Sequence, residues 1–176
     1  MKEIWRNGIG QDSHRFVLED DGEGKRLMLG GVLFPNEPAL EGNSDADVVL
    51  HALCNAISSV TGVRILGSLA DRLCAQGITD STVYLREALH TLDPAHNPSG
   101  RLYELMGIAV SIEAKRPHLA KNIEAMRIRL AQLCKLEVGD VGVTATSGEG
   151  LTDFGRGLGV AAIVSVSIRE IREIRE

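Results

Sequence analysis

The stretch NSDADVVLHALCNAISSVTG, residues 43–62, is central to the fold because it predicts a helix with two chemically different sides. Apolar residues recur at three- and four-residue steps from Val49 to Val60, as on the buried side of an amphipathic helix. The opposite side carries polar residues at the same spacing: Asp47, His51, Asn55 and Ser58. We expect Ser44 to be the N-cap of this helix and Gly62 to end it.

Segments with strand character lie on both sides of this helix. Upstream, residues 4–16 and 26–34 have β-type composition and are separated by a polar turn at 19–24, which predicts a hairpin. Downstream, the patterns predict the following further elements: strands at 106–114, 141–146 and 160–168, helices at 80–92 and from Pro117 to 133, and a weaker helical segment at 65–73. Strands alternating with helices over 176 residues predict one α/β or α+β domain.

The composition limits the partners and the compartment that we expect. Nineteen Lys and Arg against 24 Asp and Glu give a formal net charge of −5, so neither nucleic acid nor an anionic membrane is an expected partner. The chain has no apolar run of about 18 residues and no apolar leader at its start. Three widely spaced cysteines, Cys54, Cys74 and Cys134, are typical of reduced thiols, and we expect a cytoplasmic protein.

The tripeptide Asp12-Ser13-His14 is the first candidate for chemistry. On a strand, positions i and i+2 point to the same face, so Asp12 and His14 project together. With His51 from the helix they form a set of three ligands, the number expected for catalytic zinc with an open fourth position. Taken alone, Asp-x-His is a weak signal, and a single helix histidine is more often structural than a ligand.

Two further segments contain groups that could bind a nucleotide. In the glycine-rich loop 146–157, hydroxyls and backbone N–H groups could surround phosphate, with Arg156 as a cation and Glu149 as a ligand for a hard divalent ion. The turn at 114–119 could leave backbone groups free to bind a flat base. Each segment also has a plainer interpretation. The loop 146–157 could be a connection whose glycines serve only its geometry, and 114–119 could be an ordinary strand-to-helix turn.

Together these segments resemble the 2-C-methyl-D-erythritol 2,4-cyclodiphosphate synthases of the non-mevalonate isoprenoid pathway. The resemblance covers essentially the whole chain. It rests on five stretches in order: GQDSH (10–14), LGGV (29–32), NSDADVVLHAL (43–53), AKRP (114–117) and TATSGEGLTDFGRG (144–157).

The resemblance implies both a fold and a reaction. The fold is a single domain over residues 1–176, with a mixed sheet of about four strands covered by helices on one face. The implied assembly is a homotrimer whose sheets face the three-fold axis and whose active sites lie between subunits. The implied enzyme is a phosphorus–oxygen lyase that converts 4-diphosphocytidyl-2-C-methyl-D-erythritol 2-phosphate to 2-C-methyl-D-erythritol 2,4-cyclodiphosphate and releases CMP.

The resemblance also implies roles for individual residues. Zn²⁺ is bound by Asp12, His14 and His51, and a second divalent cation, Mg²⁺ or Mn²⁺, is bound by Glu149. Asn43 and Ser147 take catalytic positions. The residues implied to bind substrate, with 114–120 around the cytosine, are Ser44, Asp47, Gly67, Ala114, Lys115, Pro117, His118, Ala120, Thr146, Asp153 and Arg156.

The sequence departs from the family pattern at several of these positions. Many relatives have histidine where this chain has Asn43, which can hydrogen-bond a phosphate but cannot carry a positive charge. Ile65 stands at the position of the family's acidic contact with the diol, and Asp153 replaces a phenylalanine. Two other functions remain compatible with the sequence: a zinc-dependent phosphodiesterase or hydrolase that uses water, and a non-catalytic trimeric binding protein of the same fold.

Overall fold

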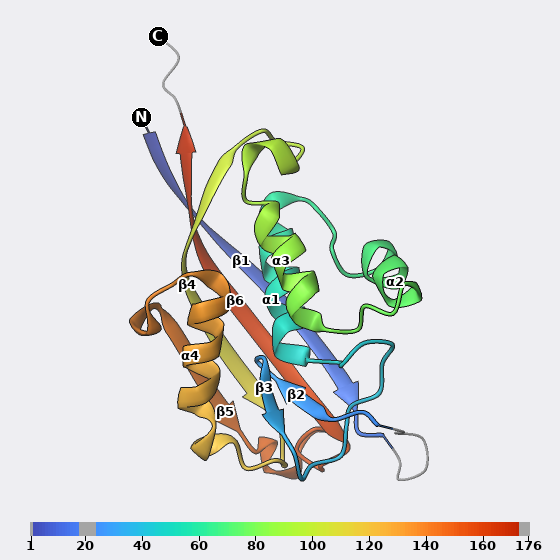
Figure 1. Ribbon diagram of the computed structural model, residues 1–176. Coiled ribbons are helices and arrows are strands. Elements are labelled where there is room, and N and C mark those ends of the chain that lie inside the picture. The colour runs from blue at the N-terminus through green and yellow to red at the C-terminus, as the bar shows by residue number, and fades with distance from the viewer. Residues whose placement is uncertain (1, 18–23, 173–176) are drawn as a thin grey trace.

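A mixed four-stranded sheet organises the molecule, for which a computed structural model describes residues 2–17 and 24–172 (Figure 1). The order across the sheet is β1-β6-β4-β5; β6 is antiparallel to both of its neighbours, whereas β4 and β5 are parallel. This arrangement confirms the expected single α+β domain with a sheet of four strands. The strands are β1 (Lys2–Arg15), β4 (Leu102–Glu113), β5 (Val141–Thr146) and β6 (Gly159–Arg172).

The helices cover one face of this sheet, as expected (Figure 1). Side chains on that face, such as Val160, Val164 and Ile168, are completely buried and build an aliphatic core. The opposite face is open and carries exposed apolar side chains, among them Ile9 and Ile163. The helices are α1 (Val48–Thr61), α2 (Ser68–Ala75), α3 (Ser81–His90) and α4 (Ile123–Cys134), and the 3-10 turns are η1 (Pro94–His96), η2 (Leu119–Lys121), η3 (Val138–Asp140) and η4 (Gly148–Gly150).

Two glycines allow α1 to lie directly on β1. A Cβ added to Gly10 would lie 2.2 Å from the carbonyl oxygen of Ala52, and one added to Gly8 would lie 2.2 Å from that of Ala56. Because no side chain separates the two backbones, functional groups on α1 and β1 come within reach of one another. This close approach positions the site described below.

The predicted hairpin between 4–16 and 26–34 is wrong. β1 pairs with β6, and the second segment folds on itself into β2 (Leu27–Leu29) and β3 (Val32–Phe34). The chain reverses at Gly30 and Gly31, whose φ angles of 60° and 72° suit the two central positions of a tight hairpin turn. Most of the polar turn, residues 19–23, lies outside the described residues.

The helix boundaries agree with the sequence in part. Gly62 ends α1 in the left-handed conformation, as the pattern predicts. The helix predicted over 80–92 is α3, which Asp80 caps and which ends at His90. The N-cap of α1 is Asp47 and not Ser44, because the Asp47 carboxylate accepts from the free N–H groups of the first turn. Pro117 does not begin the next helix, since η2 intervenes before α4 starts.

The last strand, β6, continues beyond residue 168 through charged residues up to Arg172, which is a strand extension and not a frayed helical end. Residues 173–176 lie outside the described part of the chain. Among the described residues, no helix combines the length and the apolar character needed to cross a bilayer.

Candidate active site

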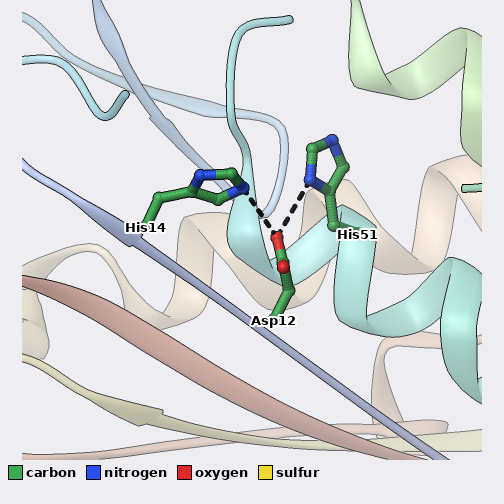
Figure 2. A group of neighbouring side chains, drawn as sticks. All are labelled: Asp12, His14 and His51. Carbon is green, nitrogen blue, oxygen red and sulfur yellow. Dashed lines mark hydrogen bonds and ion pairs between the residues drawn. The ribbon is translucent and has the colours of Figure 1, made fainter. Parts of the chain in front are cut away.

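Three potential metal ligands converge where α1 lies on β1. Asp12 and His14 project from the same face of β1, and His51 reaches them from α1, with Asp12 between the two imidazoles (Figure 2). Asp12 Oδ2 lies 3.1 Å from His14 Nε2 and 3.0 Å from His51 Nδ1. One ligand atom from each residue lies within 4.8 Å of the other two. The structure therefore brings together the three ligands expected from the sequence.

The electrostatics of these side chains suit a cation. Burial by itself would raise the pKa of Asp12, but the hydrogen bonds with His14 and His51 outweigh it and lower that pKa to about 2. The same hydrogen bond with Asp12 raises the pKa of His14. An ionised carboxylate with two imidazole nitrogens is a donor set typical of zinc. The chemistry of the donors therefore fits the expected metal.

The far nitrogen of His51 has partners that sequence reasoning missed. His51 Nε2 lies 2.9 Å from the hydroxyl of Ser81, at the start of α3, and Ser81 donates to the carboxylate of Asp45. Ser81 is 30 residues from His51 along the chain, so no local spacing could have indicated the contact.

Asp47 and Ser44 are buried beneath the site. Four backbone N–H groups, from Gly30, Gly31, Val49 and Leu50, donate to the Asp47 carboxylate at 2.6–3.1 Å. These donors reach both oxygens, and through them Asp47 holds α1 against the β2–β3 turn.

A cavity of about 190 Å³ lies where β4 and β5 end. Its lining includes seven of the residues expected to contact substrate or to act in catalysis: Ala114, Lys115, Pro117, His118, Ala120, Thr146 and Ser147. Leu119, from the turn expected to bind a base, also lines the cavity, and two further lining residues, Ile123 and Ala145, were not among the expected site residues. The mixture of apolar walls with backbone and hydroxyl groups suits a flat heterocyclic base.

The glycine-rich loop connects this cavity to the region near the metal ligands. Ser147 donates to Glu149 at 2.7 Å, and Arg156 forms an ion pair of 3.0 Å with Asp153. Asp153 also lines a second cavity, of about 220 Å³, together with His14. Asp153 therefore shares a cavity with one of the three potential metal ligands, whereas Glu149 is not part of their cluster among the described residues.

The remaining expected residues lie around the periphery. Asn43 is exposed in the bend before α1, and Gly67 is exposed at the start of α2 with open space around it. Ile65, at the position of the family's acidic contact, is buried in the core.

The comparisons with known proteins agree with this geometry. The model of the YgbB family matches residues 5–169. The chain belongs to the YgbB family. A curated relative in Chlamydia muridarum, named 2-C-methyl-D-erythritol 2,4-cyclodiphosphate synthase, is 48% identical over 95% of this chain and 89% of the relative.

Solved structures show the same fold as this YgbB-family chain. A 2C-methyl-D-erythritol-2,4-cyclodiphosphate synthase in its CDP-bound form has a TM-score of 0.76 and 29% identity, over 93% of this chain and 99% of that one. The bifunctional IspDF of Campylobacter jejuni has a TM-score of 0.79 and 28% identity, over 97% of this chain and 43% of that one.

Proposed function

We propose that this YgbB-family protein converts 4-diphosphocytidyl-2-C-methyl-D-erythritol 2-phosphate to 2-C-methyl-D-erythritol 2,4-cyclodiphosphate and CMP. An oxygen of the 2-phosphate forms a bond to the β-phosphorus, while the bond from that phosphorus to the CMP oxygen breaks and CMP leaves with the electron pair. The observation that carries the proposal is the convergence of Asp12, His14 and His51. The 48% identity to a curated synthase over nearly the whole chain supports it.

The metal ligands have a defined task in this reaction. Asp12, His14 and His51 would hold Zn²⁺ and leave a coordination position for a phosphate oxygen. A zinc ion at such a site supplies a Lewis acid that withdraws charge from the phosphate. Glu149, oriented by Ser147, would hold the second divalent cation, Mg²⁺ or Mn²⁺, near the diphosphate.

The other residues bind and orient the substrate. We place the cytosine in the cavity formed by 114–120 and 145–147, with the hydroxyls of Thr146 and Ser147 toward the diphosphate. Asn43 would hydrogen-bond the 2-phosphate, while Arg156 would supply positive charge. The nucleophile is already an anion, so these residues hold two anions close together and need not remove a proton.

The position of these groups supports a homotrimer with shared active sites. The base cavity and the metal-ligand cluster have no lining residue in common among the described residues. A neighbouring subunit could place its base cavity beside the metal ligands of the first, with the open faces of the sheets toward the three-fold axis.

The three cysteines carry free thiols, which supports a cytoplasmic location.

Phosphorus NMR of the products tests the proposed reaction. Purified protein with the substrate and Mg²⁺ is expected to give the cyclic diphosphate and CMP, and removal of zinc with a chelator should abolish turnover until zinc is restored.

His51→Ala should lower the rate by about 100-fold or more, because it removes a ligand of the ion that stabilises transition-state charge. His90→Ala changes an exposed histidine of α3 and should leave the rate unchanged.

Each other function gives a different result in this experiment. A hydrolase would give an open-chain product, and a binding protein would release no CMP at any concentration of divalent metal. Full turnover after rigorous zinc removal would contradict the metal assignment.

A further inference from the structure

The ring of His51 is held, on the side away from Asp12, by two polar side chains in series. Its Nε2 lies 2.9 Å from Ser81 Oγ, and Ser81 is hydrogen-bonded in turn to Asp45. Ser81 is completely buried. We propose that Ser81 and Asp45 are positioning residues, which fix the ring of His51 so that Nδ1 faces Asp12 and would be available as a ligand of Zn²⁺.

The direction of these hydrogen bonds follows from the protons that are available. An ionised carboxylate can only accept, so the single hydroxyl proton of Ser81 is donated to Asp45 Oδ1. The backbone N–H of Ser81 donates to the other oxygen of the same carboxylate at 3.1 Å. The Ser81 oxygen is then left to accept a hydrogen bond from His51 Nε2–H. In the neutral imidazole this leaves the lone pair on Nδ1.

The opposite side of the ring shows why this tautomer matters. His51 Nδ1 lies 3.0 Å from Asp12 Oδ2, which is also an acceptor. Two acceptors at this distance repel unless a proton or a cation lies between them. With the proton fixed on Nε2, Nδ1 is free to act as a metal ligand beside Asp12. The inference therefore rests on the proposed metal role of His51.

Ser44 is the one competing partner for Nε2 among the described hydrogen bonds. Its hydroxyl lies 3.4 Å from that nitrogen, longer than a normal hydrogen bond, and accepts from the N–H of Ala46. Ser81, at 2.9 Å, is the better placed group.

The positioning pair is also fixed by the fold. The N–H of Asp45 donates to the carbonyl of Thr79 at 2.8 Å, which ties the loop before α1 to the segment before α3. Ser81 is the first residue of α3, immediately after its cap, so its backbone is held in place. The two groups that orient His51 therefore come from separate elements that are joined to each other.

Partners of this kind hold a metal-binding histidine in one tautomer and orientation, and their loss typically weakens metal binding by about 10- to 100-fold. We expect that loss in zinc affinity for Ser81→Ala, measured at equilibrium by competition with a chelator. Ser81→Thr keeps the hydroxyl and should bind zinc nearly as tightly as the parent chain. Thr91→Val removes another buried hydroxyl from the end of α3, far from His51, and should leave zinc affinity unchanged.

A second measurement separates positioning from general stability. In the zinc-loaded protein, nitrogen-edited NMR should show a His51 Nε2–H proton that is protected from exchange with water, and Ser81→Ala should lose this protection. Asp45→Asn replaces an acceptor by a donor facing Ser81 and should lower zinc affinity in the same direction, which keeps the test valid if one variant folds poorly.

The outcomes distinguish this inference from the proposed function. If His51→Ala abolishes zinc binding but Ser81→Ala and Asp45→Asn bind zinc as tightly as the parent chain, the positioning role is wrong and the metal site stands. Equal losses for Ser81→Ala and Thr91→Val would also overturn the positioning role, because the effect would then be one of packing. If His51→Ala retains full affinity, the proposed metal site itself fails.

Discussion

Gly10 links the packing of the fold to the geometry of the metal ligands. A methyl group there would overlap the backbone of α1 at Ala52 and Ala56, which cannot move without displacing His51 from Asp12. We expect Gly10→Ala to reduce the free energy of unfolding by about 3 kcal/mol, at the upper end for overpacking, and to weaken zinc binding as well. Urea unfolding and chelator competition measure the two effects.

Gly139 provides the control for this substitution. It is exposed, and a Cβ there would meet no atom within 4 Å. Gly139→Ala should therefore change stability by less than about 1 kcal/mol and leave zinc binding intact. A Gly10→Ala protein as stable as this control would show that α1 can shift away from β1 at little cost.

Helix α1 depends on its cap to a greater extent than α3 does, and the two N-cap aspartates allow a matched comparison. Asp80 is exposed and accepts from Thr82 N, so Asp80→Ala should reduce the free energy of unfolding by about 1 kcal/mol. Asp47 is buried and accepts from four backbone N–H groups, two of them in the β2–β3 turn. Asp47→Ala leaves these donors buried without partners and should cost at least about 3 kcal/mol. Urea midpoints at one protein concentration measure both losses.

Similar losses for the two variants would mean that water or a shifted side chain satisfies the donors left by Asp47. The m-values should be the same as that of the parent chain, so that the change in midpoint reports stability alone.

Elements with local signals were predictable from the sequence, and contacts between distant elements were not. Asp12 and His14 could be placed on one face because side chains of a strand alternate with a period of two. Gly62 could be predicted as the end of α1 because a glycine in the left-handed conformation ends many helices. The hairpin was mispredicted because two segments with strand character, adjacent in sequence, imply nothing about β6, which pairs with β1 from the other end of the chain. Ser81 was missed for the same reason, since only packing of α3 on α1 brings it to His51.

At the scale of the whole molecule, the open face of the sheet carries the proposed assembly. Ile163 lies on the central strand β6 and is 48% exposed, and Ile9 of the neighbouring strand β1 is exposed on the same face. Apolar side chains gathered on one exposed face are typical of an interaction surface. In a trimer with the sheets toward the axis, Ile163→Lys would bring three positive charges together, and their repulsion should separate the subunits. Light scattering should then show the mass fall from about three times 19.0 kDa to that of one chain. Turnover should be lost with the trimer. Ile128→Lys changes an isoleucine of α4 with similar exposure on the helical side and should leave the trimer intact. A parent chain that is monomeric at micromolar concentration yet fully active would contradict shared active sites, because one chain would then complete the site by itself.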